Sequence, residues 1–235
     1  MRLYQKYCHN EVMFLALSGY TQKEFAELSR YFKHAFAERM QTYQLNGKRR
    51  GKRAYSDYHN CPLPTIEDKL FFILCYFKTN NLQAVQGALF NLNQSKANTW
   101  IHCLTPVLEN ALRAAGEMPA RTMSEIKFDE SATLYFHDGT ECPIQRPRDP
   151  TTQKEHYSGK KKCHTIKYNC LSDTECKILF LSPLTAGKKH DKKLADECNY
   201  QLPAGTRLVQ DTGFQGFTVP EVHILQPKKN AHMGI

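Results

Sequence analysis

The chain has 235 residues, of which 41% are hydrophobic and 23% charged, a composition typical of a folded protein and not of a disordered one. Its formal net charge of +9 favours a polyanionic partner such as nucleic acid. No apolar run approaches the ~20 residues that a membrane-spanning helix needs, so we expect no membrane partner.

The first half of the sequence is expected to be helical, beginning with residues 20–44. Phe25, Leu28, Phe32 and Phe36 recur there at helical spacing, with charged residues between them. A basic stretch follows and is expected to form a loop or arm. Its positive residues are Lys48, Arg49, Arg50, Lys52 and Arg53. The arm either contacts phosphates or serves as a solvated linker, and both interpretations stay open.

Three further helices are expected between residues 65 and 112. Thr65, with Asp68 three residues later, predicts a capped start for the first, and Asn80-Asn81 predicts its end. Its predicted buried face carries Ile66, Leu70, Ile73, Leu74 and Phe77. A second helix is expected over residues 82–90. Ser95 is expected to cap the third, in which Pro106 predicts either a kink or a restart with Thr105 as cap.

A short polar turn before the third helix is typical of a helix-turn-helix module. In that geometry the first residues of the third helix meet the major groove of DNA, where amide and ammonium groups contact bases and phosphates. The residues expected there are Gln94, Lys96, Asn98 and Thr99. A plain helical bundle with solvated polar residues would show the same pattern, so it remains an alternative.

The second half of the sequence has the pattern of a mixed α/β sheet. Residues 163–171 alternate, with Thr165, Lys167 and Asn169 on one face, and a turn at 172–175 predicts an antiparallel hairpin. The expected strands cover residues 133–136, 163–171, 177–184, 207–209 and 222–225, with a helix over residues 188–200. The expected fold class is α+β, with an all-helical module followed by a mixed α/β sheet domain.

Two aspartates occupy similar settings in this half. Asp138 and Asp211 each follow an apolar stretch and precede glycine, directly or one residue later, so each is expected at the end of a buried strand. Carboxylates held on rigid strands can share divalent metal ions, and Mg²⁺ prefers one or two carboxylates completed by water and phosphate oxygens. Each aspartate alone is equally typical of an ordinary turn.

A basic segment lies between the two aspartates. From Gln145 to His190 the chain has ten lysines and arginines against four acids. Lys160, Lys161 and Lys162 follow Tyr157-Ser158-Gly159, as in a loop that presents ammonium groups to phosphates or simply to solvent. The combination favours metal-dependent chemistry on phosphodiesters.

The nine cysteines are expected to be reduced and mostly buried thiols. Their number is odd, and no pair has Cys-x-x-Cys spacing. A zinc site from Cys163-His164 with Cys170 and Cys176 is the weaker alternative, because the spacing fits no common template.

The order of motifs resembles bacterial insertion-sequence transposases of the DDE superfamily. The matching segments are Asp138-Gly139-Thr140-Glu141, Pro143-Ile144-Gln145-Arg146-Pro147, Tyr157-Ser158-Gly159-Lys160-Lys161-Lys162, Thr165-Ile166-Lys167, His190-Asp191, Leu202-Pro203-Ala204-Gly205 and Gln210-Asp211-Thr212-Gly213-Phe214-Gln215-Gly216. The resemblance spans about residues 60 to 229. It implies a helix-turn-helix over residues 61–120, after an N-terminal helical segment and arm over 1–60. A ribonuclease H-like domain would cover residues 130–235.

The resemblance also implies an activity and its requirements. Transposon-end and target DNA would be cleaved and joined by a protein that acts as a homo-oligomer in the cytoplasm, at the nucleoid. Asp138 and Asp211 would be the first two of three acids that bind two divalent ions, Mg²⁺ or Mn²⁺. His190 and Asp191 match a recurrent pair of unfixed role, with a helix start beside the site as the modest interpretation.

The third acid of the family, usually Glu on a later helix, has no match in this sequence. Glu141 belongs to the first motif, and Glu221 is too close to Asp211. Because the sequence stops 24 residues after Asp211, we expect an incomplete domain with exposed apolar sheet surface and little or no cleavage by this polypeptide alone. Two alternatives stay open: a catalytically inactive DNA-binding fragment that represses by occupying transposon ends, and an unrelated metal-dependent nuclease.

Overall fold

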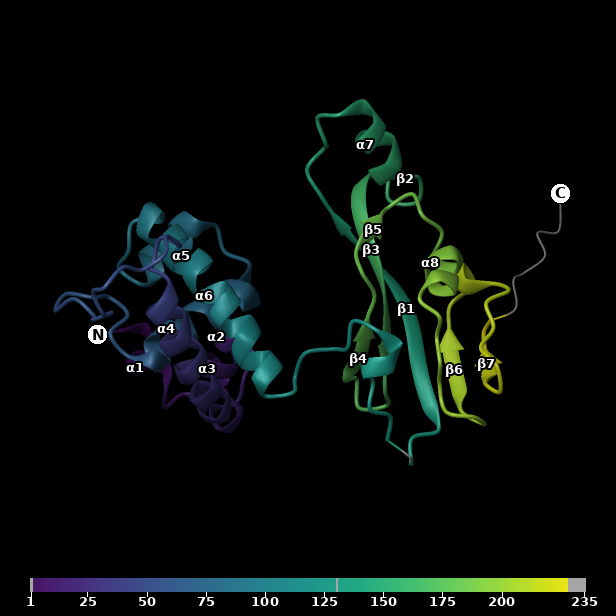
Figure 1. Ribbon diagram of the computed structural model, residues 1–235, viewed down its shortest axis with the longest axis horizontal. Helices are drawn as coiled ribbons and strands as arrows, with labels where there is room; N and C mark the ends of the chain where they lie inside the picture. The colour runs from purple at the N-terminus through teal and green to yellow at the C-terminus, as the bar shows by residue number, and fades with distance from the viewer. Residues whose placement is uncertain (1, 130, 228–235) are drawn as a thin grey trace. The chain divides into compact units, whose positions relative to one another are not determined.

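The computed structural model describes residues 2–129 and 131–227 and divides into two compact units, one up to Met118 and one from Pro119 (Figure 1). The first unit is all helical and the second holds a mixed sheet, which confirms the expected α+β class. Among these residues, no helix is both long and apolar enough to cross a membrane.

The helical unit is built on one hydrophobic core. Its helices are α1 (Leu3–Tyr7), α2 (Glu11–Ser18), α3 (Gln22–Thr42), α4 (Ile66–Thr79), α5 (Gln83–Leu89) and α6 (Gln94–Ala114). The rings of Phe14, Phe25 and Phe71 meet at 5.1–6.4 Å between centroids and join α2, α3 and α4. The long helix expected over residues 20–44 is confirmed as α3, whereas α1 and α2 were not predicted.

Helix α4 begins as the sequence predicts but is buried on more than one side. Thr65 and Asp68 form the capping box, and Asn80 ends the helix in the left-handed conformation. Every residue from Asp68 to Cys75 is buried, because α1, α2, α3 and α6 all pack against this helix. Phe77, predicted on the buried face, is instead 53% exposed, since it lies beyond that packing.

The turn between α5 and α6 is tightly packed against the end of α5 and contains polar residues. A Cβ at Gly87 would stand 2.6 Å from the carbonyl oxygen of Leu92, so only glycine lets the turn pack this tightly. Asn93 caps α6 by accepting a 2.8 Å hydrogen bond from the Lys96 amide, so the prediction that Ser95 is the cap is wrong. Helix α6 continues through Pro106 as one element, which also excludes the restart at Thr105.

The sheet unit places its two longest strands side by side at the centre (Figure 1). Its strands are β1 (Leu134–Pro143), β2 (Tyr157–Ser158), β3 (Cys163–Ser172), β4 (Ile178–Leu181), β5 (Thr185–Ala186), β6 (Arg207–Gln210) and β7 (His223–Leu225). The main order is β2-β3-β1-β6-β7, and β4 and β5 also pair with β3. Strand β1 is antiparallel to β3 and parallel to β6, so the sheet is mixed.

Short helices complete this unit. They are η1 (Met123–Glu125), α7 (Pro150–His156), α8 (Asp191–Glu197) and η2 (Thr212–Phe214). The hairpin of β3 with β4 and the helix within residues 188–200 are confirmed, while α7 was not predicted. The single strand expected over 177–184 is wrong, because the chain breaks at Ser182-Pro183 into β4 and β5.

The two faces of the sheet differ in burial. Thr165, Lys167 and Asn169 of β3 share one face, as the alternation predicts, and all three are buried, which was not predicted for these polar residues. On the other face Phe136 is 39% exposed, and Leu225 of the edge strand is 43% exposed. The polar side of β3 therefore faces inward, toward α8.

Candidate functional site

Asp138 lies in the middle of β1, where one neighbouring strand ends. The parallel pairing of β1 with β6 stops at His137 and Gln210, whereas pairing with β3 continues to Pro143. The prediction that Asp138 ends its strand is therefore wrong, because β3 extends β1 by pairing with it. The Asp138 side chain is exposed, and its Oδ1 accepts the Gly139 amide at 2.8 Å.

Asp211 directly follows β6, as the sequence predicts. It caps η2, and its Oδ1 accepts the Gly213 amide at 2.6 Å. Asp138 and Asp211 are each the next residue after the paired His137 and Gln210, on parallel strands that lie about 4.8 Å apart. The structure thus places the two residues on adjacent strands where β6 ends, a region called here the strand-end site.

Asp191 stands at this site as well. Helix α8 begins at Asp191 with His190 as its N-cap residue, and it lies beside the end of β6 (Figure 1). A Cβ added to Gly213 would lie 2.9 Å from Asp211 Oδ1 and 3.0 Å from Asp191 Oδ2. These two carboxylate oxygens therefore surround one small space, while His190 is exposed and makes no side-chain cap.

Lys167 is a buried cation inside this group, and sequence reasoning did not single it out. Its Nζ lies 2.9 Å from Asp191 Oδ1 and 3.1 Å from Glu141 Oε1, and its side chain is 6% exposed. Burial by itself would raise the pKa of Glu141, but hydrogen bonds from Ser158 and Lys167 and the charge of Lys167 leave it lowered. The one feature that could have identified Lys167 is its position on the inward face of an alternating strand.

His137 is a core residue beside the two acids. Its Nδ1 lies 3.4 Å from Gln210 Oε1, and the rings of Phe214 and Tyr200 pack on it at 4.0 and 4.6 Å. Burial lowers the pKa of His137 to about 4, with Gln210, Asp191 and Asp211 opposing that shift. The imidazole is therefore neutral near pH 7 and serves packing.

The donor chemistry of the strand-end site suits a hard divalent cation. Among residues 2–129 and 131–227, no three His, Cys, Asp or Glu side chains converge closely enough to hold an ion. Two carboxylates are nevertheless sufficient for Mg²⁺, which keeps waters and takes phosphate oxygens. The facing oxygens of Asp211 and Asp191 meet that requirement. The expected absence of a third acid after Asp211 concerns in part residues 228–235, which lie outside the described residues.

The lysines expected to meet phosphates are open to solvent. Lys160, Lys161 and Lys162 follow β2, and all three are exposed. The loop is ordered by Ser158, whose carbonyl and hydroxyl oxygens accept the amides of Lys162 and Lys161 at 2.8 and 3.2 Å. The ammonium groups are therefore free to meet an anion.

The residues expected to contact bases lie at the start of α6, but they are not equivalent. Gln94 and Lys96 are exposed. Asn98 donates its Nδ2 to Gln83 Oε1 at 3.0 Å, which ties α6 to α5, and the Thr99 hydroxyl bonds to the carbonyl oxygen of Ser95 at 3.0 Å. The first two side chains are thus available to DNA, and the other two are engaged within the module.

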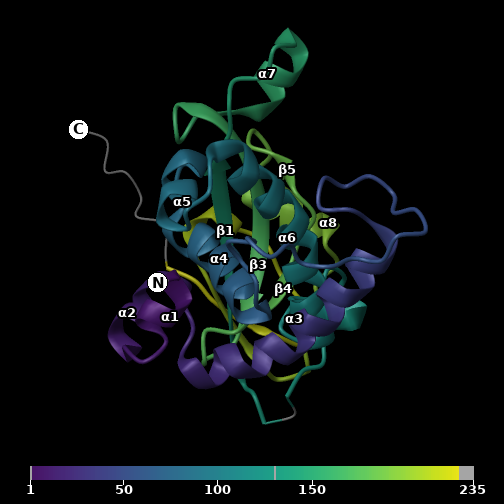
Figure 2. The same ribbon diagram turned by 90° about the vertical axis from the view of Figure 1, so that its left-hand side faces the viewer.

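The basic arm is anchored to the helical unit through Arg50. Its guanidinium donates twice to the carbonyl oxygen of Tyr43, at 3.0 and 3.2 Å, and lies 5.5 Å from the ring centre of Tyr55. The other four basic residues of the arm are exposed. Figure 2 shows the arm as a loop standing out from the helical unit beside α3 and α6. Arg50 therefore shapes the arm, and its neighbours face solvent.

The arm and α6 share a hollow of about 460 Å³. Its lining includes Arg50, Lys52, Arg53 and Tyr55 of the arm together with Thr99 of α6. The structure thus brings two predicted DNA-contacting segments, far apart in sequence, to one surface.

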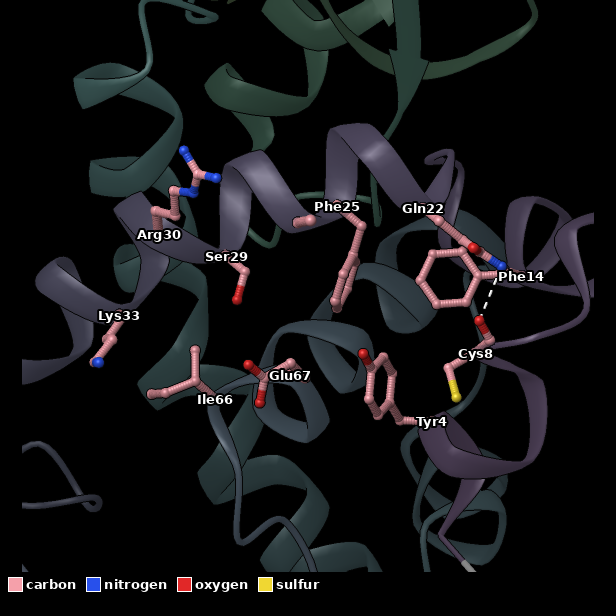
Figure 3. A pocket seen from close by; sticks show the side chains of 11 residues that line it. Tyr4, Cys8, Phe14, Gln22, Phe25, Ser29, Arg30, Lys33, Ile66 and Glu67 are labelled. Carbon is pink, nitrogen blue, oxygen red and sulfur yellow. Dashed lines mark hydrogen bonds between the residues drawn. The ribbon is translucent and has the colours of Figure 1, made fainter.

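A second hollow of about 460 Å³ lies among α1, α3 and α4 (Figure 3). Aromatic rings of Tyr4, Phe14 and Phe25 line it together with Arg30 and Glu67, and none of the predicted site residues reaches it.

The nine cysteines are free thiols, of which only Cys75 and Cys103 are buried, so the expectation of mostly buried thiols is wrong. Six are half-buried, three of them on the long strands β1 and β3 and three in loops or at helix ends.

Two protein families match segments of this chain, one in each of its two units. The family described as "DDE superfamily endonuclease" matches residues 137–233, and "Helix-turn-helix of DDE superfamily endonuclease" matches residues 61–114. A curated protein of Microchaete diplosiphon, named "Probable transposase for insertion sequence element IS702", is 22% identical over 213 residues. That alignment covers 88% of this chain and 73% of the relative. No solved structure matches the chain.

Proposed function

The chain belongs to the DDE superfamily of insertion-sequence transposases, and on that premise we propose that it binds DNA through its helical unit and cuts DNA at the strand-end site. The observation that carries the proposal is the shared register of Asp138 and Asp211, each the next residue after a paired position on parallel strands. Two carboxylates at one sheet edge are the arrangement that metal-dependent phosphodiester chemistry needs.

Asp138 and Asp211 are the residues that would hold the divalent ions, Mg²⁺ or Mn²⁺, which this superfamily typically uses. A bound ion supplies stabilisation of the attacking and leaving oxygens during an in-line displacement. The amides of Gly139 and Gly213 help to orient the two carboxylates, because each donates to an Asp Oδ1. The buried His137 precedes Asp138 in β1 and packs against Phe214 and Tyr200.

DNA would be held by charge and by the start of α6. Gln94 and Lys96 extend from the exposed N-terminal turn of α6 and would meet base edges and phosphates in the major groove. The exposed arm lysines and arginines would bind phosphates beside it, and Lys160, Lys161 and Lys162 would do so near the sheet. Transposon ends and target duplex are the proposed substrates.

The test uses labelled duplex carrying insertion-sequence ends, with random duplex as the control, in the presence and absence of Mg²⁺ or Mn²⁺. The proposal expects a specific shift without metal; nicking should need metal and should be weak, because the family's third acid has no match in the sequence. Asp138→Asn and Asp211→Asn should each abolish nicking and leave the shift unchanged. Nicking that persists in Asp211→Asn would refute the assignment.

A second function, occupation of DNA ends without cleavage, is favoured by the self-contained core of the helical unit. Such a protein would act as a repressor. It predicts the same specific shift but no nicking with any divalent metal, so the same assay separates the two functions.

A further inference from the structure

Asp191 lies between the two glycines that accompany the candidate acids. A Cβ on Gly139 would stand 3.2 Å from Asp191 Oδ1, and a Cβ on Gly213 would stand 3.0 Å from Asp191 Oδ2. Both distances are shorter than ordinary carbon–oxygen contacts, so each glycine leaves room for this carboxylate. The Asp191 side chain is only 25% exposed, and it is held in the site.

The two oxygens of Asp191 have different surroundings. Lys167 Nζ donates to Oδ1 at 2.9 Å and is itself held by Glu141 at 3.1 Å. Oδ2 faces the space that Asp211 Oδ1 also borders. Lys167 therefore fixes the direction of the carboxylate and leaves one oxygen directed at the candidate metal ligand.

A buried side-chain oxygen without a hydrogen-bond partner borders the Gly139 position beside the other oxygen of this carboxylate, Asp191 Oδ1. Asn169 is fully buried, its Nδ2 donates to the Asp191 carbonyl at 3.3 Å, and its Oδ1 has no hydrogen-bond partner in the part of the chain described. That Oδ1 lies 3.4 Å from the position that a Cβ on Gly139 would occupy. Asp191 Oδ1 borders the same position. A buried oxygen without a partner is unfavourable unless a water or a cation satisfies it.

The charge balance also favours a cation. Asp191 and Glu141 share one ammonium group, that of Lys167, and Asp211 Oδ1 borders the same small space as Asp191 Oδ2. Carboxylate oxygens that border one small space repel each other unless a proton or a cation lies between them. A divalent ion would offset most of the remaining negative charge.

We propose that Asp191 binds the divalent ion beside Asp211 through its Oδ2, and that Lys167 is the positioning residue that orients this carboxylate. The inference rests on the proposed metal site and adds a carboxylate that the sequence left without a role. It also explains why the chain has glycine at both Gly139 and Gly213.

The test measures Mn²⁺ binding to the full chain by the loss of the free-ion electron paramagnetic resonance signal, with DNA nicking as a second readout. Asp191→Asn should weaken Mn²⁺ affinity about tenfold or more, the loss typical when a group around a metal is removed. Asp196→Asn, on the same helix and paired with Lys192, is the matched control and should bind as the unaltered protein does.

Two further variants separate ligation from a structural role. Gly213→Ala fills the space between Asp211 and Asp191 without changing any charge and should also weaken Mn²⁺ binding. Gly159→Ala, where a Cβ meets nothing within 4 Å, is its control. Lys167→Met should weaken binding less than Asp191→Asn, and Lys167→Arg should restore part of it. Circular dichroism checks that each variant is folded.

The outcomes distinguish the two proposals. If Asp211→Asn loses Mn²⁺ while Asp191→Asn and Gly213→Ala bind normally, Asp191 is only the first residue of α8 and this inference is wrong. If Asp211→Asn also binds normally, the metal site of the proposed function fails as well.

Discussion

Lys69 of α4 and Asp57 of the basic arm form an ion pair, with 3.2 Å between Nζ and Oδ1. The Lys69 side chain is 1% exposed and that of Asp57 34%. Lys69 also donates to the carbonyl oxygen of Pro64 at 3.2 Å and lies over the rings of Phe36 and Trp100. The far end of the arm is thereby tied to the core of the helical unit.

This pair predicts an asymmetric response to mutation. Asp57→Asn leaves a buried ammonium without its counter-ion and should destabilise the helical unit by about 3 kcal/mol. Lys69→Met leaves unpaired only the Asp57 carboxylate, which water reaches. It should therefore lower the free energy of unfolding by clearly less than Asp57→Asn does. The chain has one tryptophan, Trp100 in α6, so urea unfolding followed by its fluorescence reports on this unit alone. The opposite order of stabilities would contradict the account.

The basic residues of the arm should contribute unequally to DNA binding. Replacing Lys48, Arg49, Lys52 and Arg53 together with Ala should reduce the salt dependence of binding by roughly 0.9 in the logarithmic slope per lost phosphate contact. Arg50→Gln should change the slope by less than one contact, because Arg50 is engaged with Tyr43 and Tyr55. Fluorescence anisotropy over a series of salt concentrations measures both. An unchanged slope for the fourfold variant would make the arm a linker.

The start of α6 should depend on Asn93. Asn93→Ala removes the cap that accepts the Lys96 amide and should cost about 1 kcal/mol of unfolding free energy. Ser95→Ala should change stability little, since the Ser95 side chain caps nothing. Trp100 fluorescence in urea compares the two, and a larger loss for Ser95→Ala would argue against the observed cap.

Cysteine reactivity should follow burial. Burial raises the pKa of the Cys75 thiol to about 12, so almost no thiolate is present near pH 7.5. Cys176 is exposed and should be alkylated first by iodoacetamide. Mass spectrometry over time should find Cys75 unmodified until urea unfolds the helical unit. Equal alkylation rates at Cys75 and Cys176 would mean that α4 is not buried in the core of the helical unit.

Local sequence patterns were enough for the cap at Thr65 and for the strand before Asp211, but not for the cap of α6 or for long-range pairing. The Thr65 cap and the strand before Asp211 depend on neighbouring residues, and both were predicted correctly. The position of Asp138 was predicted wrongly because β1 is lengthened by β3, about 30 residues away. Nothing in the local pattern of β1 shows that partner.

Buried charges were missed for the same reason. Lys69 interrupts an apolar helix and Lys167 lies in a basic segment, so each looks like a solvated residue in the sequence. Their partners, Asp57, Glu141 and Asp191, are 12 to 26 residues away in the chain. Only the folded structure shows that these lysines are buried and paired.

The most direct test of a metal site at Asp138 and Asp211 is iron-directed cleavage of the protein's own backbone. With Fe²⁺, ascorbate and peroxide, the account predicts cuts near residues 138 and 211 that excess Mg²⁺ suppresses and that Asp138→Asn with Asp211→Asn removes. Absence of cuts at both places, or cuts that survive the double substitution, would contradict a divalent metal site at the strand ends.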